Sequence, residues 1–256
     1  MTQRLQPFNG LSEKLKLNDS TTKNLTYEEL SRPIKTIKCR HGIFDENHPC
    51  GECIKLRQGL SSNEESQEMT TLLQQIGIRE RFAKCDLNNF DTSLCNEQGH
   101  VLDITKIYCE EEKFINNGIN FILLGSTGTG KTHLITGIAK KLIMQSNYRI
   151  KLWRPHDLVQ DKFLKRQPYQ AYTNDVDLLM LDDLGARPLN ELERAVINDI
   201  LYERYDRKQA TVITSNFSTD ELRAFLGERS YSRLADEPNI IFTLCWENQR
   251  KKYTLV

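Results

Sequence analysis

Hydrophobic and polar positions follow a repeating order over the last two-thirds of the 256-residue chain. Short apolar runs, which are typical of strands buried on both faces of a parallel sheet, are each followed by a segment with apolar residues at helical spacing. The predicted strands cover 121–125, 149–153, 177–182, 211–215 and 240–244, and the predicted helices cover 131–144, 157–164, 189–205, 219–226 and 229–235. This alternation predicts an α/β fold in which helices cover both faces of a parallel sheet.

The first part of the chain lacks that alternation. Residues 1–60 are polar with weak helical patterning, and they contain a dense group of Cys and His residues at 39–53. The polar run SSNEESQEMT at 61–70 indicates a linker or the solvated start of a helix. We therefore predict a small N-terminal domain over 1–60, a linker over 61–75 and the α/β domain over 76–256.

The composition, 38% hydrophobic and 27% charged residues, is typical of a soluble globular protein. Because 35 Lys and Arg residues balance 35 Asp and Glu residues, the chain as a whole has no electrostatic attraction to nucleic acid. No apolar run is long enough to cross a bilayer and the N-terminus lacks the layout of a signal peptide, so we expect a cytoplasmic protein without a membrane partner. Seven cysteines without a secretory context favour reduced thiols over disulfides.

The loop GSTGTGKT, between the first predicted strand and its helix, matches the P-loop pattern in full. Its glycines let successive backbone N–H groups point at phosphates, and the N-terminus of the helix adds positive charge at the same place. Lys131 is expected to reach the β- and γ-phosphates, and the Thr132 hydroxyl to bind Mg²⁺. The alternative is a glycine-rich turn without a ligand. The predicted nucleotide-binding residues of the loop are Gly125, Ser126, Thr127, Gly128, Thr129, Gly130, Lys131 and Thr132.

Acidic and amide side chains follow two other predicted strands. In DLLMLDDLG, Asp182 is expected to hold Mg²⁺ through water, and Asp183 to orient or deprotonate the attacking water. Asn216 follows TVITS at the same edge of the sheet, where it would position that water or contact the γ-phosphate. Alternatively, the aspartates cap the strand end and Asn216 is a helix N-cap or turn residue. No N-K-x-D element, the usual guanine reader, follows the P-loop, which favours ATP as the nucleotide.

The N-terminal segment CRHGIFDENHPCGEC has the residue types of a zinc site. Cys50 and Cys53 are spaced as a half-site, whereas Cys39 and His41 are separated by a single residue. We predict Zn²⁺ ligands at Cys39, His41, Cys50 and Cys53, with His48 as the substitute for His41; reduced thiols or a redox pair are the alternatives. Metal would stabilise a domain too small and polar to bury much core. The remaining cysteines are expected to be packing residues: Cys85, Cys95, Cys109 and Cys245.

Five segments occur together in an order that resembles one protein family. FILLGSTGTGKTHL, DLLMLDDLGA, TVITSN, LGERSYSRL and WENQRKKY resemble the DnaC/IstB-like branch of AAA+ ATPases, and within it the bacterial and phage loaders of the replicative DNA helicase. The similarity covers roughly residues 75–256. It implies the AAA+ αβα sandwich, with ATP bound at the interface between neighbouring subunits and therefore self-assembly through that interface. Some loaders carry a similar Cys/His cluster before the ATPase domain.

The resemblance also implies roles for three arginines. Arg233, in LGERSYSRL, matches the arginine finger that reaches the γ-phosphate held by an adjacent subunit, and Arg229 lies in the same segment. A planar, permanently charged guanidinium suits that role. Arg250, in WENQRKKY, matches the sensor-2 arginine that contacts phosphate within its own subunit. For each, a surface arginine is the alternative.

The resemblance also assigns two further regions, one to DNA binding and one to the adenine. An insertion after its second strand binds single-stranded DNA, and here the basic and aromatic residues suited to that contact are Lys162, Phe163, Lys165, Arg166 and Tyr169. A solvated amphipathic helix explains the same residues. The segment 78–91 resembles the family's entry into the core, where Ile78 and Phe90 would border the adenine.

These observations favour an ATP-dependent loader of the replicative DNA helicase, whose N-terminal domain contacts the helicase and whose AAA+ domain assembles around ATP and single-stranded DNA. One alternative is an IstB-type transposition helper ATPase with the same core. Another is an ATP-binding zinc adaptor that does not hydrolyse ATP, because Asp183 stands where many relatives have Glu. If the chain is an ATPase, the shorter Asp side chain predicts slow hydrolysis.

Overall fold

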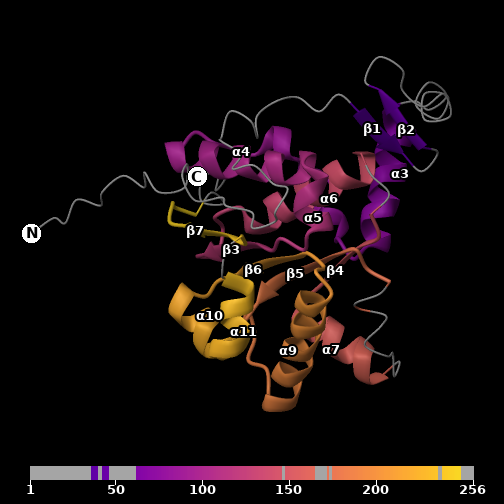
Figure 1. The fold of residues 1–256 in the computed structure, drawn as a ribbon. Coiled ribbons are helices and arrows are strands. Elements are labelled where there is room, and N and C mark those ends of the chain that lie inside the picture. Colours follow the sequence, from indigo (N-terminus) through magenta and orange to yellow (C-terminus); the bar gives the residue numbers. More distant parts are fainter. Residues whose placement is uncertain are drawn as a thin grey trace, which may run out of the picture.

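The computed structural model describes residues 36–39, 42–45, 62–145, 148–164, 172, 175–235 and 238–248. Within these ranges a five-stranded parallel sheet lies between two layers of helices (Figure 1). Its strands run in the order β4-β5-β6-β3-β7, so β3 lies between β6 and β7. They are β3 (Phe121–Gly125), β4 (Ile150–Trp153), β5 (Leu178–Leu184), β6 (Thr211–Ser215) and β7 (Ile240–Leu244). The predicted α/β fold with a parallel sheet is therefore confirmed.

The helices divide between the two faces of the sheet (Figure 1). One layer contains α3 (Ser62–Gln75), α4 (Asn96–Glu110), α5 (Glu112–Asn116) and α6 (Lys131–Gln145), with the 3-10 helices η1 (Glu80–Phe82) and η2 (Leu87–Asn89). The other layer contains α7 (Pro155–Leu164), α9 (Glu191–Asp206), α10 (Thr219–Leu226) and α11 (Glu228–Ala235). Two hydrophobic cores result, one on each face.

Strand β3 shows why both cores form. Its side chains point alternately to the two faces, as in any strand. Phe121 and Leu123 are buried in the core under α4 and α6, whereas Ile122 and Leu124 are buried in the core under α9 and α10. A strand that packs on both faces needs apolar residues at every position, which is the run FILL in the sequence.

The periodic segments of the sequence agree closely with the structure. Strands 121–125, 211–215 and 240–244 and helix 219–226 have their predicted bounds, and β5 continues past Asp182 to Leu184. Helix α4, which was not predicted, buries Val101, Thr105 and Tyr108 on one side. Its buried face includes polar and aromatic side chains, so its hydrophobic periodicity is weak.

The segment predicted as a linker is mostly helix α3. Met69, Leu73 and Ile76 recur at helical spacing and pack against the core of the first layer, and Leu73 is only 1% exposed. The backbone after the helix then meets the edge strand β4, where the Leu152 N–H donates to the Ile76 carbonyl at 2.6 Å. The helix is therefore packed against the rest of the first layer over part of its length. The predicted division into domains stays a prediction.

Several polar groups where the strands begin are hydrogen-bonded within the protein. Arg204 of α9 is 0% exposed, and its guanidinium donates to the carbonyls of Tyr172, Val176, Asp177 and Ala210 and to the Thr211 hydroxyl. The Asn120 Oδ1 accepts from the Thr211 N–H at 2.9 Å, and the Asn120 N–H donates to Asn239 Oδ1 at 2.8 Å. These bonds join the beginnings of β3, β5, β6 and β7. We call this side of the sheet, where the strands begin, the closed edge, because hydrogen bonds within the protein link its strands.

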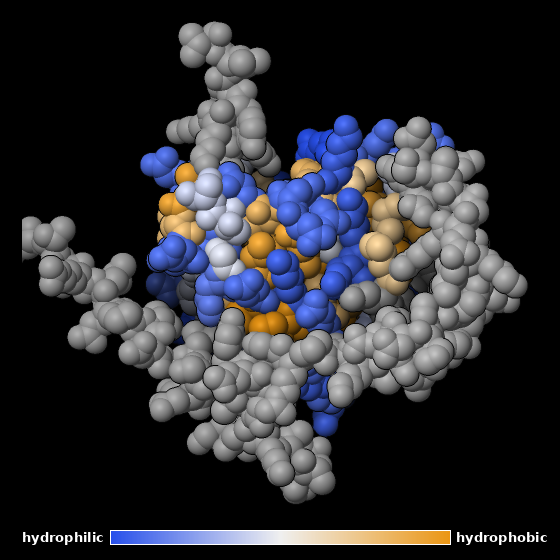
Figure 2. Space-filling model, turned by 90° about the horizontal axis from the view of Figure 1, so that it is seen from above, coloured by the Kyte–Doolittle hydropathy of each residue, from blue (hydrophilic) through white to orange (hydrophobic). Residues whose placement is uncertain are grey.

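The remaining described residues include a small second sheet. β1 (Thr36–Cys39) and β2 (Gly42–Asp45) form an antiparallel hairpin that pairs Cys39 with Gly42. The face seen from above in Figure 2 carries apolar areas between hydrophilic side chains. Across the described ranges, no helix is both long enough and apolar enough to serve as a bilayer span.

Candidate nucleotide-binding site

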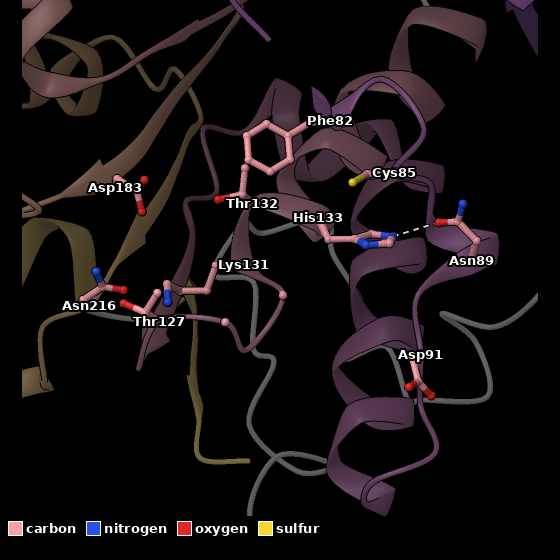
Figure 3. Close-up of a pocket in the computed structure, with 12 residues that line it drawn as sticks. Phe82, Cys85, Asn89, Asp91, Thr127, Lys131, Thr132, His133, Asp183 and Asn216 are labelled. Atoms are coloured by element: carbon pink, nitrogen blue, oxygen red, sulfur yellow. Dashed lines mark hydrogen bonds between the residues drawn. The ribbon is translucent and has the colours of Figure 1, made fainter. Parts of the chain in front are cut away.

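A pocket of about 260 Å³ opens at the edge of the sheet where β3, β5 and β6 end (Figure 3). The carboxyl edge of a parallel sheet is where ligands bind in α/β proteins. One side of the pocket comes from the P-loop, the end of β5 and the residue after β6, and the other side from the segment around η1 and η2. The lining residues are Phe82, Cys85, Asn89, Asp91, Thr127, Gly128, Gly130, Lys131, Thr132, His133, Asp183 and Asn216.

The P-loop needs glycine at two positions for steric reasons. Gly128 and Gly130 have φ angles of 90° and 97°, a region that side chains rarely tolerate. A Cβ on Gly128 would lie 1.9 Å from Asn248 Oδ1, and one on Gly130 would lie 2.6 Å from the Phe90 ring. The loop is therefore packed closely by residues from two distant parts of the chain.

Lys131 begins helix α6 and is 5% exposed. Its Nζ donates to the carbonyls of Gly125 at 2.7 Å and Ser126 at 2.8 Å, and the Thr129 hydroxyl donates to the same Ser126 carbonyl at 3.0 Å. The ammonium thus lies against the loop while the residue lines the pocket (Figure 3). An ammonium beside a helix N-terminus, with loop glycines around it, fits a phosphate group.

A carboxylate and two hydroxyls meet next to the loop. Thr132 Oγ1 and Thr214 Oγ1 both donate to Asp182 Oδ1, at 3.2 Å and 2.6 Å. Asp182 is 4% exposed, and burial raises the pKa of its carboxyl group, an effect that the bond from Thr214 partly opposes. Hydroxyl and carboxylate oxygens are the ligands that Mg²⁺ prefers. The structure therefore brings together Thr132 and Asp182, the two predicted Mg²⁺ residues.

Asp183 and Asn216 lie on the same side of the pocket in Figure 3. Asp183 has a left-handed backbone with φ of 60°, and its N–H donates to Thr214 Oγ1 at 2.8 Å. This conformation is uncommon for a residue other than glycine and is found at functional sites. Both residues line the same pocket as Lys131.

The opposite wall contains residues that the sequence did not single out. His133 Nε2 lies 2.8 Å from Asn89 Oδ1 and 2.9 Å from the Asp86 carbonyl, and burial lowers the pKa of His133. The His133 ring meets the Phe90 ring edge-on, at 5.4 Å between centroids. Phe90, which was predicted beside the adenine, packs against Gly130 of the P-loop. Ile78, the other residue predicted there, is buried in the core, and neither residue lines this pocket.

Arg229 and Arg233 lie on α11 and do not line the pocket of their own chain. The Arg233 guanidinium stacks on Tyr202 of α9, at 4.3 Å from the ring centroid, and approaches Tyr205 at 5.4 Å. Arg229 lies 5.7 Å from the Tyr202 ring. Both tyrosines are partly exposed, so the two arginines and the two rings form a surface patch.

The remaining predicted residues are only partly described. Lys162 and Phe163 belong to the end of α7, and Cys39 is the last residue of β1. The other predicted DNA and zinc residues and the predicted sensor-2 arginine lie outside the described residues: Lys165, Arg166, Tyr169, His41, His48, Cys50, Cys53 and Arg250. Among the residues that the structure does describe, no group of three or more His, Cys, Asp or Glu is arranged to hold a metal ion.

The four cysteines outside the cluster differ in exposure. All of them are free thiols. Cys109 is buried, as expected of a packing residue, and burial raises the pKa of its thiol. Cys85 and Cys95 are half-buried, and Cys85 lines the pocket. Cys245 is exposed, so the expectation that it is a packing residue is wrong.

The sequence is similar to a family of ATP-binding proteins and to named members of known function. The model of the family described as IstB-like ATP binding protein matches residues 68–235. The replicative helicase loader DnaC of Buchnera aphidicola subsp. Acyrthosiphon pisum is 29% identical over 194 residues, which is 73% of this chain and 77% of the relative. The DnaC loader of Escherichia coli strain K12 is 25% identical over 201 residues, 76% of this chain and 81% of the relative.

Solved structures share the fold. A crystal structure of the DnaC helicase loader has a TM-score of 0.57 at 22% identity and covers 66% of this chain and 100% of the other. AMPPCP-bound DnaA from Aquifex aeolicus has a TM-score of 0.52 at 25% identity, with 66% of this chain and 52% of the other covered. These likenesses place the fold among the AAA+ P-loop ATPases.

Proposed function

The chain belongs to the family of IstB-like ATP binding proteins, and from this premise we propose that it is an ATP-dependent loader of the replicative DNA helicase. One observation carries the proposal. A complete P-loop, with Lys131 and Thr132 at one pocket and Asp182 hydrogen-bonded to Thr132, occurs in a chain that is similar over about three-quarters of its length to proteins named replicative helicase loaders. The pocket supports the ATP site of the proposal. The names of the relatives support the helicase partner and the role in replication.

The residues of the pocket divide the work of binding and hydrolysis. The loop N–H groups and Lys131 bind and orient the phosphates, and Thr132 and Asp182 hold Mg²⁺, which when bound neutralises phosphate charge. Asp183 accepts a proton from the attacking water or orients it, and Asn216 holds that water from the side. Because Asp183 is one methylene shorter than Glu, we expect slow turnover.

Arg233 acts on the nucleotide of a second copy of the chain. It lies away from the pocket of its own chain and on a surface patch with Arg229, Tyr202 and Tyr205. A guanidinium held there reaches a γ-phosphate only across an interface between subunits. This arrangement supports the self-assembly through ATP that the family resemblance implies.

Two partners complete the proposal. Single-stranded DNA would contact the region from Lys162 to Tyr169, where cations and aromatic rings are interleaved. The N-terminal 60 residues would contact the helicase, with Zn²⁺ held by Cys39, His41, Cys50 and Cys53, His48 being the substitute for His41. Metal analysis should give one Zn²⁺ per chain, lost in Cys50→Ser/Cys53→Ser and kept in the exposed-thiol control Cys245→Ser. Retention of Zn²⁺ by the double variant would contradict the zinc assignment.

The direct test is size-exclusion chromatography of the purified chain with the replicative helicase of the same organism, in ATP, in ADP and without nucleotide. We expect a complex in ATP, and Lys131→Ala should remove the dependence on ATP. If the chain and the helicase do not elute together in any nucleotide state, the loader function is contradicted. Capture of a transposase encoded beside the gene, in the same assay, would instead support a transposition helper, the other function that the IstB-like family name allows.

Hydrolysis in trans has a sharper test. Arg233→Ala should bind ATP normally but lose turnover at least tenfold, because the finger stabilises charge only during the reaction. Mixing Arg233→Ala with Lys131→Ala, each inactive alone, should restore part of the turnover, since the finger of one copy then meets the intact pocket of the other. Arg223→Ala is the matched control, because Arg223 also stacks on a tyrosine, at 4.7 Å from the Tyr231 ring. Unchanged turnover in Arg233→Ala would show that the finger is misassigned.

A further inference from the structure

The residues that follow β7 pack against the P-loop. Trp246 Nε1 donates a hydrogen bond to the Thr129 carbonyl at 2.8 Å, across 117 positions of sequence. Two residues later, the Asn248 side chain packs on Gly128, where an added Cβ would lie 1.9 Å from Asn248 Oδ1 and would displace it. The Trp246 ring is half-buried against the core of the first layer. The position of this indole is therefore set by the fold and does not depend on the loop.

The bond from Trp246 fixes the direction of one peptide unit in the loop. The Thr129 carbonyl and the Gly130 N–H belong to the same planar trans peptide, so they point in opposite directions. Thr129 is 0% exposed, whereas Gly130 lines the pocket. Holding the carbonyl on the buried side thus turns the Gly130 N–H away from it, toward the side on which the nucleotide binds.

The loop needs such a restraint at this place. Gly130 has φ of 97°, and glycine populates positive and negative φ about equally, so the peptide before it can flip at little steric cost. The Thr129 hydroxyl is tied to the Ser126 carbonyl, but that bond restrains the side chain and not the peptide that follows. The indole N–H is the donor that the structure places on the carbonyl itself.

We infer that Trp246 is a positioning residue for nucleotide binding, which holds the Thr129–Gly130 peptide in the orientation that presents its N–H to a phosphate. The inference rests on the ATP site of the proposed function. Trp246 does not touch the nucleotide; it acts through the loop. It also places the described residues after β7, as far as Asn248, beside the P-loop.

The test compares two single substitutions on equilibrium binding of Mg-ATP. Trp246→Phe removes the N–H and keeps an aromatic ring, and we expect ATP affinity to fall about 2- to 10-fold, the effect of one lost hydrogen bond. Trp153→Phe is the control, because Trp153 is also half-buried but packs on Tyr172, with 6.1 Å between ring centroids, and is not among the residues that line the nucleotide pocket. Its ATP affinity should not change.

A spectroscopic readout separates positioning from general packing. Trp246 is the single tryptophan left in Trp153→Phe, since the chain has two. Its emission should shift on saturation with Mg-ATP, and the shift should be absent in Trp153→Phe/Lys131→Ala. If ATP binds the wild type while Trp246→Phe keeps full affinity, or while the emission of Trp246 does not respond, the inference is overturned and the ATP site stands. If the wild type binds no ATP, both fail. Should Trp246→Phe not fold, the emission measurement alone decides.

Discussion

Two buried cations lie at opposite edges of the same parallel sheet, Lys131 where the strands end and Arg204 where they begin. Both donate to main-chain carbonyls. Arg204 donates to the carbonyls of Tyr172, Val176, Asp177 and Ala210 and to the Thr211 hydroxyl, and it is not among the residues that line the pocket at the P-loop. Lys131 bonds two carbonyls of its own loop and lines a pocket of about 260 Å³. Similar chemistry therefore has different uses at the two edges.

The neighbours of the two cations differ in the same way. At the beginning of the strands, the side-chain amide oxygens of Asn120 and Asn239 accept hydrogen bonds from backbone N–H groups. At the end of the strands, the Asp182 carboxylate accepts from the hydroxyls of Thr132 and Thr214, whose O–H groups can rotate. A carboxylate held by rotatable donors can be shared with a cation without breaking the fold. One edge therefore stabilises the sheet, and the other is built to take a ligand.

The largest effect is expected at the closed edge. Arg204→Leu would leave the carbonyls of Tyr172, Val176 and Asp177 buried without their donor, and the free energy of unfolding should fall by about 3–5 kcal/mol. Chemical denaturation measures it. Arg207→Leu is the control, because that side chain is exposed and pairs only with Glu203 of the same helix. Equal losses in the two variants would contradict a special role for the closed edge.

At the open edge, stability and binding should separate. Lys131→Ala should lower ATP affinity by about 10- to 100-fold, the effect of losing a charged hydrogen-bond donor, and should change the melting temperature little. The control is Lys141→Ala, on the same helix but in a surface pair with Glu110 at 3.2 Å. A large fall in melting temperature with unchanged ATP affinity would reverse the assignment of the two edges.

The sequence predicted the open edge better than the closed one. Gly125 to Thr132, Asp182 and Asn216 follow strands whose apolar runs are clear, so their meeting at one edge follows from a parallel sheet. Arg204 occupies a position in an amphipathic helix where an arginine is normally exposed. Its burial follows from the donors that the carbonyls before β5 and at the start of β6 need, which no local pattern reveals.

Other contacts were unpredictable for a related reason. The wall with Phe82, Cys85, Asn89 and Asp91 comes from an irregular segment without strand or helix periodicity. The bond from Trp246 to Thr129 joins residues 117 positions apart. Such contacts depend on how finished elements pack, and hydrophobic periodicity carries no information about them.

The smallest effect is a surface pair near the closed edge. Arg149 donates to Asp177 at 2.7 Å, and this bond lowers the pKa of the Asp177 carboxyl below its ordinary 3.8. A lowered pKa in the folded state means that the stabilisation is present above pH 3.8 and disappears as the pH falls through the folded-state pKa. Because the side chains are 55% and 33% exposed, it should be below about 1 kcal/mol.

That pair is checked by melting curves of the wild type and Asp177→Asn between pH 7 and pH 3. The wild type should melt slightly higher at neutral pH, and the difference should vanish toward the acid end. Asp175→Asn serves as the control, since Asp175 is 72% exposed and lies 3.9 Å from Arg149. A difference that grows on acidification would contradict the sign of the shift.

The account depends most on ATP at the open edge, and equilibrium dialysis with labelled ATP tests this directly. The wild type should bind one ATP per chain with saturation, more tightly with Mg²⁺ than with a chelator present, because Thr132 and Asp182 share the cation with the phosphates. Under the same dialysis conditions, Lys131→Ala should bind ATP at least tenfold more weakly. Absence of saturable binding, or equal binding by the wild type and Lys131→Ala, would contradict the central claim.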